Sequence, residues 1–229
     1  MSPPGLLATT WIILRKDLLI EWRTKARLNA LLFFAVATLL LFSFALGPDT
    51  RLLKLSSGAY LWLSLLLSSV LALGESFRVE RENGALDGLR LAPTDARAIF
   101  LGKALGNAFL LFLMGAVLAP ILVALFGVTY EMGLPRLFGV LALGCLAIAA
   151  PGTVYSAIAS HARARDVLLP LLLFPMLVPP LMASVKATNL VMQGDLMGNQ
   201  LPAWLGLLAG FNLIYWGLGF VLFPKAVEG

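Results

Sequence analysis

Charged residues are scarce in this chain of 229 residues. Asp, Glu, Lys and Arg make up 13% of it, about half of the quarter that is usual in soluble domains. Hydrophobic residues make up 60%, and the mean hydropathy is +0.91. A soluble domain of this size could not bury so much apolar surface. The composition therefore places the chain among integral membrane proteins.

Cysteine and histidine occur once each, as Cys145 and His161. One cysteine cannot form a disulfide within the chain, and one histidine cannot supply both axial ligands of a haem. We interpret His161 as a solvated residue at the membrane boundary and expect no metal site in this chain. The phosphate-loop pattern G-x-x-x-x-G-K-[ST] is also missing. We therefore predict a protein that is not an enzyme, with any ATP hydrolysed on a separate cytoplasmic subunit.

Long hydrophobic runs dominate the rest of the chain. Six of them are each close to the ~20 residues that cross ~30 Å of hydrocarbon. Helices satisfy their backbone groups internally, so we predict an all-α integral membrane protein. No ionisable residue falls in the middle of a predicted span, which argues against an ion-coupled pump. The predicted transmembrane helices cover residues 28–46, 58–74, 104–128, 136–160, 167–185 and 204–223.

Residues 1–27 precede the first span and carry five cations. Trp11, Leu14, Leu18 and Trp22 follow spacings of three and four, which places them along one side of a helix. We predict an amphipathic helix in the headgroup region, with Trp11 and Trp22 as membrane anchors. The alternative is a cytoplasmic tail with a basic flank.

Lysine and arginine are unevenly distributed between the two sides of the predicted topology. If the N-terminus lies inside, 13 of the 17 lie on the inner side and 4 on the outer side. Cytoplasmic segments of membrane proteins carry such an excess of cations. We therefore predict that both termini and residues 76–103 are cytoplasmic.

Residues 76–103 are the longest polar stretch of the chain. Their core indicates a short helix, a turn at Asn83-Gly84 and a second short helix that ends before Pro93. Leu86 and Leu89 are apolar residues in an otherwise polar element, which favours a docking surface for a partner protein. The alternative is a solvated face of mixed charge. The residues that we predict to couple this loop to an ATPase are Arg78, Glu80, Arg81, Glu82, Gly84, Leu86, Asp87 and Leu89.

The fifth predicted span contains four prolines: Pro170, Pro175, Pro179 and Pro180. Each proline removes a backbone donor and strains the preceding turn. We expect a helix distorted between Pro170 and Pro180. Irregular backbone is tolerated at membrane depth only where protein or a water-filled cavity covers it. The span is therefore either a gate or lining helix or a packed, kinked structural helix.

Three segments together carry a resemblance to a known family. The stretch RVERENGALDGLRLAP at 78–93 resembles the coupling loop of ABC-2 type export permeases. The opening WIILRKDLLIEWR at 11–23 and the proline-rich LLLFPMLVPP at 171–180 are similar to those of the haem exporter protein B family, CcmB. The resemblance covers nearly the whole chain. It supports two regions: an interfacial helix at 1–27 and an ABC-2 exporter-like domain of six helices at 28–229, with a coupling loop at 76–103.

The resemblance implies a permease subunit of the bacterial inner membrane that acts in cytochrome c maturation. The partners it implies are a cytoplasmic ABC ATPase, a second copy of the chain, a haem-handling membrane subunit, a small single-span subunit and a periplasmic haem chaperone. The bilayer is a further partner, and no nucleic acid is expected. Haem would be cargo handled by the complex, since we expect no cofactor on this chain. The alternatives are an ABC-2 permease for another substrate, or a force-transmitting assembly subunit that carries no substrate.

Overall fold

The computed structural model describes residues 5–47, 49–82, 95–160, 165–195 and 198–228. Within these ranges the backbone is almost entirely helical and contains no strand, which confirms the predicted all-α fold. The helices are α1 (Leu6–Thr24), α2 (Ala26–Leu46), α3 (Thr50–Glu82), α5 (Ala96–Phe126), α6 (Leu134–Ser160), α7 (Arg165–Gln193) and α8 (Gln200–Glu228). Six of them, α2, α3, α5, α6, α7 and α8, are long and apolar enough to cross a membrane, as predicted.

The helices extend beyond the predicted spans, most of all around residues 76–103. α3 continues through Glu82, and α5 begins at Ala96, so the predicted loop is shorter than its polar composition suggests. Glu and Arg are good helix formers, and polarity alone does not end a helix. The start of α5 is fixed by Asp95, whose side chain accepts a hydrogen bond from the Arg97 backbone N–H at 2.9 Å.

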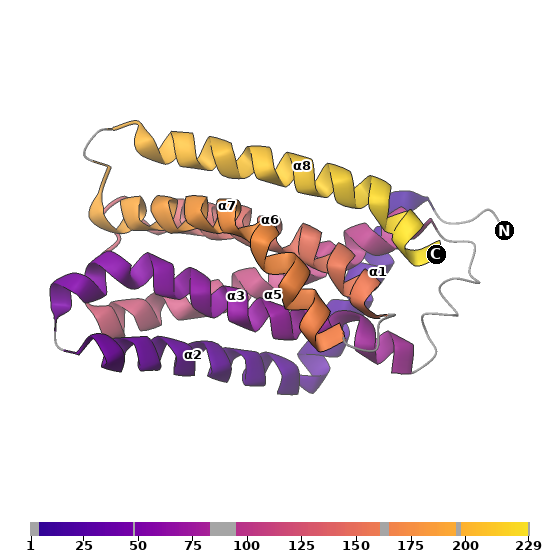
Figure 1. Cartoon of the computed structure of the whole chain (residues 1–229), viewed down its shortest axis with the longest axis horizontal. Coiled ribbons are helices and arrows are strands. Elements are labelled where there is room, and N and C mark those ends of the chain that lie inside the picture. Colours follow the sequence, from indigo (N-terminus) through magenta and orange to yellow (C-terminus); the bar gives the residue numbers. More distant parts are fainter. Residues whose placement is uncertain (1–4, 48, 83–94, 161–164, 196–197, 229) are drawn as a thin grey trace.

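The six spanning helices form one bundle with α6 near its centre (Figure 1). α6 contacts α3, α5, α7 and α8, and 72% of its most apolar 18-residue stretch is buried. α8 and α2 lie on opposite sides of the bundle. Only 17% of the corresponding stretch of α8 and 22% of that of α2 are buried. α1, the end of α3, the start of α5 and the end of α8 all lie at one end of the bundle (Figure 1).

The opposite end of the bundle is closed by residues 127–133, between α5 and α6. The Tyr130 hydroxyl donates a hydrogen bond of 2.6 Å to the Ala119 carbonyl, and the Met132 N–H donates one of 3.1 Å to the Val191 carbonyl. Burial raises the pKa of Tyr130 to about 12. The phenol therefore stays protonated at neutral pH and remains a donor.

The centre of the bundle is packed around Trp62 of α3, which is 1% exposed. Its indole Nε1–H donates to the Thr188 hydroxyl of α7 at 2.8 Å. A Cβ added at Gly144 of α6 would collide with the Trp62 ring and with Ser184 Oγ. Three helices therefore meet at a point where only glycine leaves room for the indole.

Gly144→Ala should destabilise the folded protein by about 1–3 kcal/mol, because overpacking forces the Trp62 ring to move. Gly139→Ala is a matched control in the same helix, since a Cβ at Gly139 meets nothing within 4 Å. The control should be neutral or slightly stabilising, because alanine favours a helix over glycine. Thermal unfolding in detergent followed by tryptophan fluorescence measures both. Equal melting temperatures for the two variants would contradict this packing.

Candidate functional site

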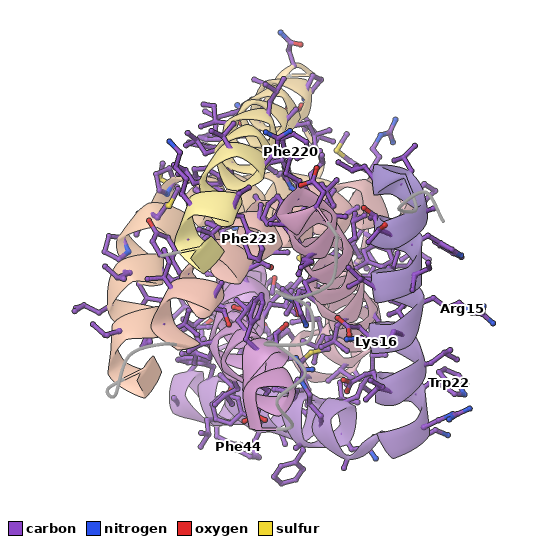
Figure 2. All side chains as sticks on the ribbon, turned by 90° about the vertical axis from the view of Figure 1, so that its right-hand side faces the viewer. Arg15, Lys16, Trp22, Phe44, Phe220 and Phe223 are labelled. Atoms are coloured by element: carbon purple, nitrogen blue, oxygen red, sulfur yellow. The ribbon has the colours of Figure 1, made fainter. Side chains whose placement is uncertain are left out.

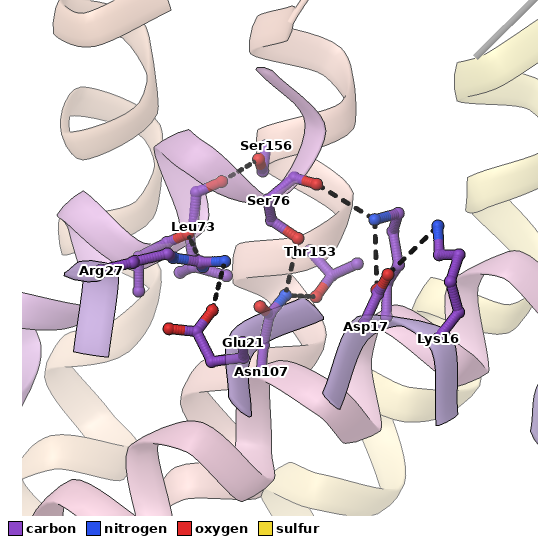
Figure 3. A network of polar contacts seen from close by, with 11 residues as sticks. Lys16, Asp17, Glu21, Arg27, Leu73, Ser76, Asn107, Thr153 and Ser156 are labelled. Carbon is purple, nitrogen blue, oxygen red and sulfur yellow. Dashed lines mark hydrogen bonds and ion pairs between the residues drawn. The ribbon is translucent and has the colours of Figure 1, made fainter. Parts of the chain in front are cut away.

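A cluster of buried and partly buried polar side chains lies at the end of the bundle that contains α1 (Figure 3). It brings together α1, α3, α5 and α6, together with the first residues of α2. The side chains that form its hydrogen bonds and ion pairs are Lys16, Asp17, Glu21, Arg27, Ser76, Lys103, Asn107, Thr153 and Ser156. Hereafter these nine residues are called the polar junction.

Lys103 lies at the centre of the polar junction. Its side chain comes from the third turn of α5 and is only 2% exposed. The ammonium Nζ lies 3.4 Å from Asp17 Oδ2 of α1 and donates a hydrogen bond of 3.0 Å to the Ser76 carbonyl of α3. It also lies 4.8 Å from the centre of the Phe77 ring, within range of a cation–π interaction. A charge so deeply buried is tolerated because several partners replace the water that it has lost.

The polar junction also ties α6 to α3 and α5. Asn107, one turn after Lys103, donates from Nδ2 to the hydroxyls of Thr153 and Ser76, at 3.1 and 3.4 Å. Ser156 of α6 donates to the Leu73 carbonyl of α3. These contacts give the Asn107 amide and the Ser156 hydroxyl hydrogen-bond partners inside the protein.

A second ion pair joins α1 to the start of α2. Arg27 Nη1 lies 3.3 Å from Glu21 Oε2, and Arg27 Nη2 donates to the Ala72 carbonyl of α3. With Lys103 and Ser156, three side chains from three different helices therefore donate to carbonyls within residues 72–76 of α3. A cavity of about 90 Å³ adjoins both ion pairs and is lined partly by Glu75 and Asn107. This volume is large enough for water.

α1 places its carboxylates toward the bundle and its tryptophans away from it. Figure 2, a view along the bundle, shows α1 from the side, with Arg15 and Trp22 pointing outward. Trp11 and Trp22 are 63% and 73% exposed, whereas the Asp17 and Glu21 side chains are 25% and 13% exposed. The helix therefore presents tryptophans outward, and its two carboxylates face the bundle beside buried Ile13.

Close packing against α5 fixes the position of α1. A Cβ at Gly102 would lie 2.8 Å from Ile13 Cγ2 and 3.0 Å from the Thr10 carbonyl. Leu14 lies over Gly106, one turn further along α5. Gly102 thus allows α1 to approach α5 closely enough for Asp17 to reach Lys103.

Only some of the predicted coupling residues lie within the described part of the chain. Arg78, Glu80, Arg81 and Glu82 belong to the last turns of α3, and their side chains lie outside the described residues. Gly84, Leu86, Asp87 and Leu89 lie outside them altogether, as do Asn83, Pro93 and His161. The role predicted for this segment therefore stays a prediction.

α7 remains helical through all four of its prolines. Figure 1 shows that its first and second halves run in different directions. Pro175 is exposed on the surface of the chain, whereas Pro180 is buried. The role of the span as a gate stays a prediction.

Cys145 is a buried free thiol in α6.

Sequence reasoning missed the polar junction. The predicted loop at 76–103 includes Lys103, but this residue lies inside α5, so the predicted start of the third span at residue 104 is too late. Two signals were available: Lys103 and Asn107, like Asp17 and Glu21, are four residues apart and share a helix face. What the spacing does not indicate is that these two faces meet.

The fold and the polar junction define a multi-pass helical membrane protein whose N-terminal helix is held to the bundle by partly buried ion pairs. The model of the family described as "CcmB protein" matches residues 8–228, so the chain belongs to the CcmB family, as its resemblance predicted. It is 28% identical to "Heme exporter protein B" of Pseudomonas aeruginosa over 88% of this chain and 90% of that protein. It is 30% identical to "Heme exporter protein B" of Rhodobacter capsulatus, over 87% and 89% of the two chains.

Asp17→Asn should lower the free energy of unfolding by about 2 kcal/mol or more, because it leaves the buried Lys103 charge uncompensated. Lys103→Met should cost less, since Asp17 is partly exposed and keeps Lys16 at 3.2 Å. Lys16→Met is the control; the Lys16 side chain is 42% exposed, so loss of its ion pair with Asp17 should cost about 0–1 kcal/mol. Thermal unfolding in detergent gives the ranking. A Lys16 variant as damaging as the Asp17 variant would contradict it.

Spin labels placed one at a time along residues 9–25 should show lipid contact with a period near 3.6 residues. The expected maxima are at positions 11 and 22, where the side chains point away from the bundle, and the minima are at 10 and 17. Collision rates with oxygen and with a water-soluble relaxing agent measure this. Uniform water exposure along the segment would contradict an interfacial helix.

Proposed function

We propose that the chain is the membrane permease subunit of an ATP-driven ABC exporter complex in cytochrome c maturation. The observation that carries the proposal is the CcmB family match over residues 8–228. The similar proteins of Pseudomonas aeruginosa and Rhodobacter capsulatus are both called "Heme exporter protein B". In this proposal the complex supports haem delivery to, or release of, a periplasmic haem chaperone. Haem is its cargo rather than a cofactor of this chain.

The proposed complex contains a cytoplasmic ABC ATPase, which hydrolyses the ATP. It also contains a second copy of this chain, a haem-handling membrane subunit and a small single-span subunit. The chain lies in the bacterial inner membrane with both termini in the cytoplasm. Two observations support this orientation: the excess of Lys and Arg on one side of the spans, and the common position of α1 and the end of α8 at one end of the bundle.

The polar junction suggests how the ATPase would act on the membrane domain. The segment between α3 and α5 is the proposed docking site, and Ser76 and Lys103 lie on the two helices that flank it. Lys103 bonds directly to the Ser76 carbonyl and to Asp17. A displacement of the docked segment would therefore move α3, α5 and α1 together, since a packed, ion-paired group moves as a rigid unit.

The same connection favours a second candidate function, a force-transmitting assembly subunit that carries no substrate. Force transmission needs a rigid connection between the docking segment and the membrane helices, and the contacts of Lys103 with α1 and α3 support such a connection. It does not need a path through the chain. A purified complex that hydrolyses ATP and assembles its partners, but moves no haem across liposomes, would favour this alternative.

Glu82→Arg should weaken retention of the ATPase about tenfold or more during purification, because a charge pair at a desolvated interface is worth ~1.5 kcal/mol or more. Glu131→Arg is the matched control, since Glu131 is exposed at the opposite end of the bundle. Both variants should insert normally. Affinity purification followed by mass spectrometry of the co-purified subunits measures the difference.

Cysteines at positions 82–89 should crosslink to the ATPase, whereas a cysteine at position 131 should not. If neither variant changes ATPase retention and the cysteines never crosslink, the docking segment is assigned wrongly. If no ATPase or haem-handling subunit co-purifies with the unaltered chain, the proposed function itself fails.

A further inference from the structure

Pro180 leaves the backbone carbonyl of Met176 in α7 without its usual hydrogen-bond donor. In an α-helix the carbonyl of residue 176 accepts from the N–H of residue 180. That residue is Pro180, which has no N–H. Met176 is half-buried in the bundle, away from either end of α7. A carbonyl without a donor is unfavourable at membrane depth, so the helix alone cannot satisfy this position.

Tyr215 of α8 supplies the missing donor. Its hydroxyl donates a hydrogen bond of 2.8 Å to the Met176 carbonyl, and the residue is 7% exposed. Tyr155 of α6 approaches the same residue from another side, and its hydroxyl lies 3.3 Å from Met176 Sδ. Tyr215 thus bonds to the backbone carbonyl that Pro180 leaves without its helical donor, and Tyr155 contacts only the Met176 side chain. This difference makes Tyr155 a natural control.

A further contact contributes to the bend on the following turn. Ser184 Oγ donates to the Pro180 carbonyl at 2.8 Å, within α7 itself. Such a bond to the carbonyl four residues earlier competes with the helical N–H and bends helices. The bend therefore has an internal component at Ser184 and an external one at Tyr215.

Two polar contacts fix the position of Tyr215 along α8. Asn212 Nδ2 donates to the Leu143 carbonyl at 2.9 Å, and Trp216 Nε1 donates to the Leu146 carbonyl at 3.2 Å. Both carbonyls belong to α6. Because α8 is otherwise little buried, these bonds to α6 set the register that brings Tyr215 opposite Met176.

We propose that Tyr215 is the positioning residue that holds the bend of α7, by replacing the hydrogen bond that Pro180 cannot make. The geometry of α7 then depends on α8 and not on its own sequence alone. A movement of α8 relative to α7 would break this bond and release the bend. The assignment of Tyr215 stands on the contacts of α7 and α8; its consequence for gating rests on the proposed function.

The test restores the missing donor. In Pro180→Ala the alanine N–H can donate to the Met176 carbonyl, so the Tyr215 hydroxyl becomes dispensable. Tyr215→Phe removes only the hydroxyl and should alter α7 in the Pro180 background but not in the Pro180→Ala background. Tyr155→Phe should alter α7 in neither background, since the Met176 carbonyl keeps a hydrogen-bond donor in both.

Spin labels at positions 171 and 193 report the geometry of α7, because both side chains are exposed and the two positions flank Met176 and Pro180. They would be roughly 33 Å apart along a straight helix. Pulsed electron-resonance distances are measured in a Cys145→Ala background. The expected result is a shifted and broadened distance distribution for Tyr215→Phe that disappears when Pro180→Ala is added.

If Tyr215→Phe changes the distance distribution equally with Pro180 and with Pro180→Ala, or prevents folding in both backgrounds, Tyr215 acts only through packing. That result would overturn the proposal. An unchanged distribution in Tyr215→Phe would also overturn it. If Tyr215→Phe alone fails to fold and the double variant folds, the rescue supports the proposal. The yield of mature c-type cytochrome is measured separately. A changed α7 with an unchanged yield would count against α7 as a gate while leaving the role of Tyr215 intact.

Discussion

The burial of the Lys103 charge is the constraint on which one end of the bundle depends. A desolvated ammonium group requires partners on several sides, and these come from two other helices: Asp17 of α1, and the Ser76 carbonyl and the Phe77 ring of α3. If α1 were displaced, the lysine would lose its carboxylate. The position of the N-terminal helix is therefore tied to the charge balance of α5 as well as to apolar contact.

Backbone carbonyls are the groups through which these helices hold one another. Lys103 and Arg27 donate to α3, Tyr215 donates to α7, and Asn212 and Trp216 donate to α6. In a bilayer, lipid adds little to the attraction between helices, so close packing and bonds of this kind contribute to association. They are also directional, which makes the register of each helix against its neighbours specific.

The sequence predicted the spans well because hydropathy and helix length are local properties. It also indicated that α7 is unusual, since prolines act on their own helix. It could not predict the pairing of Lys103 with Asp17, because the two residues are 86 positions apart and their meeting depends on the packing of α1 over Gly102. Tyr215 opposite Met176 was hidden for the same reason: the missing N–H of Pro180 was visible, but its replacement was not.

Lys25 joins α1 and α2 as a single residue with a left-handed backbone, at φ 49°. Its N–H bonds to the Glu21 carbonyl, and its carbonyl accepts from the Asn29 N–H, so the hydrogen bonding of both helices runs into it without a loop. The chain therefore has no slack at this corner. One residue more or fewer would turn Arg27 by about 100° around the axis of α2, away from Glu21. At this corner the number of residues is under stricter constraint than their identity.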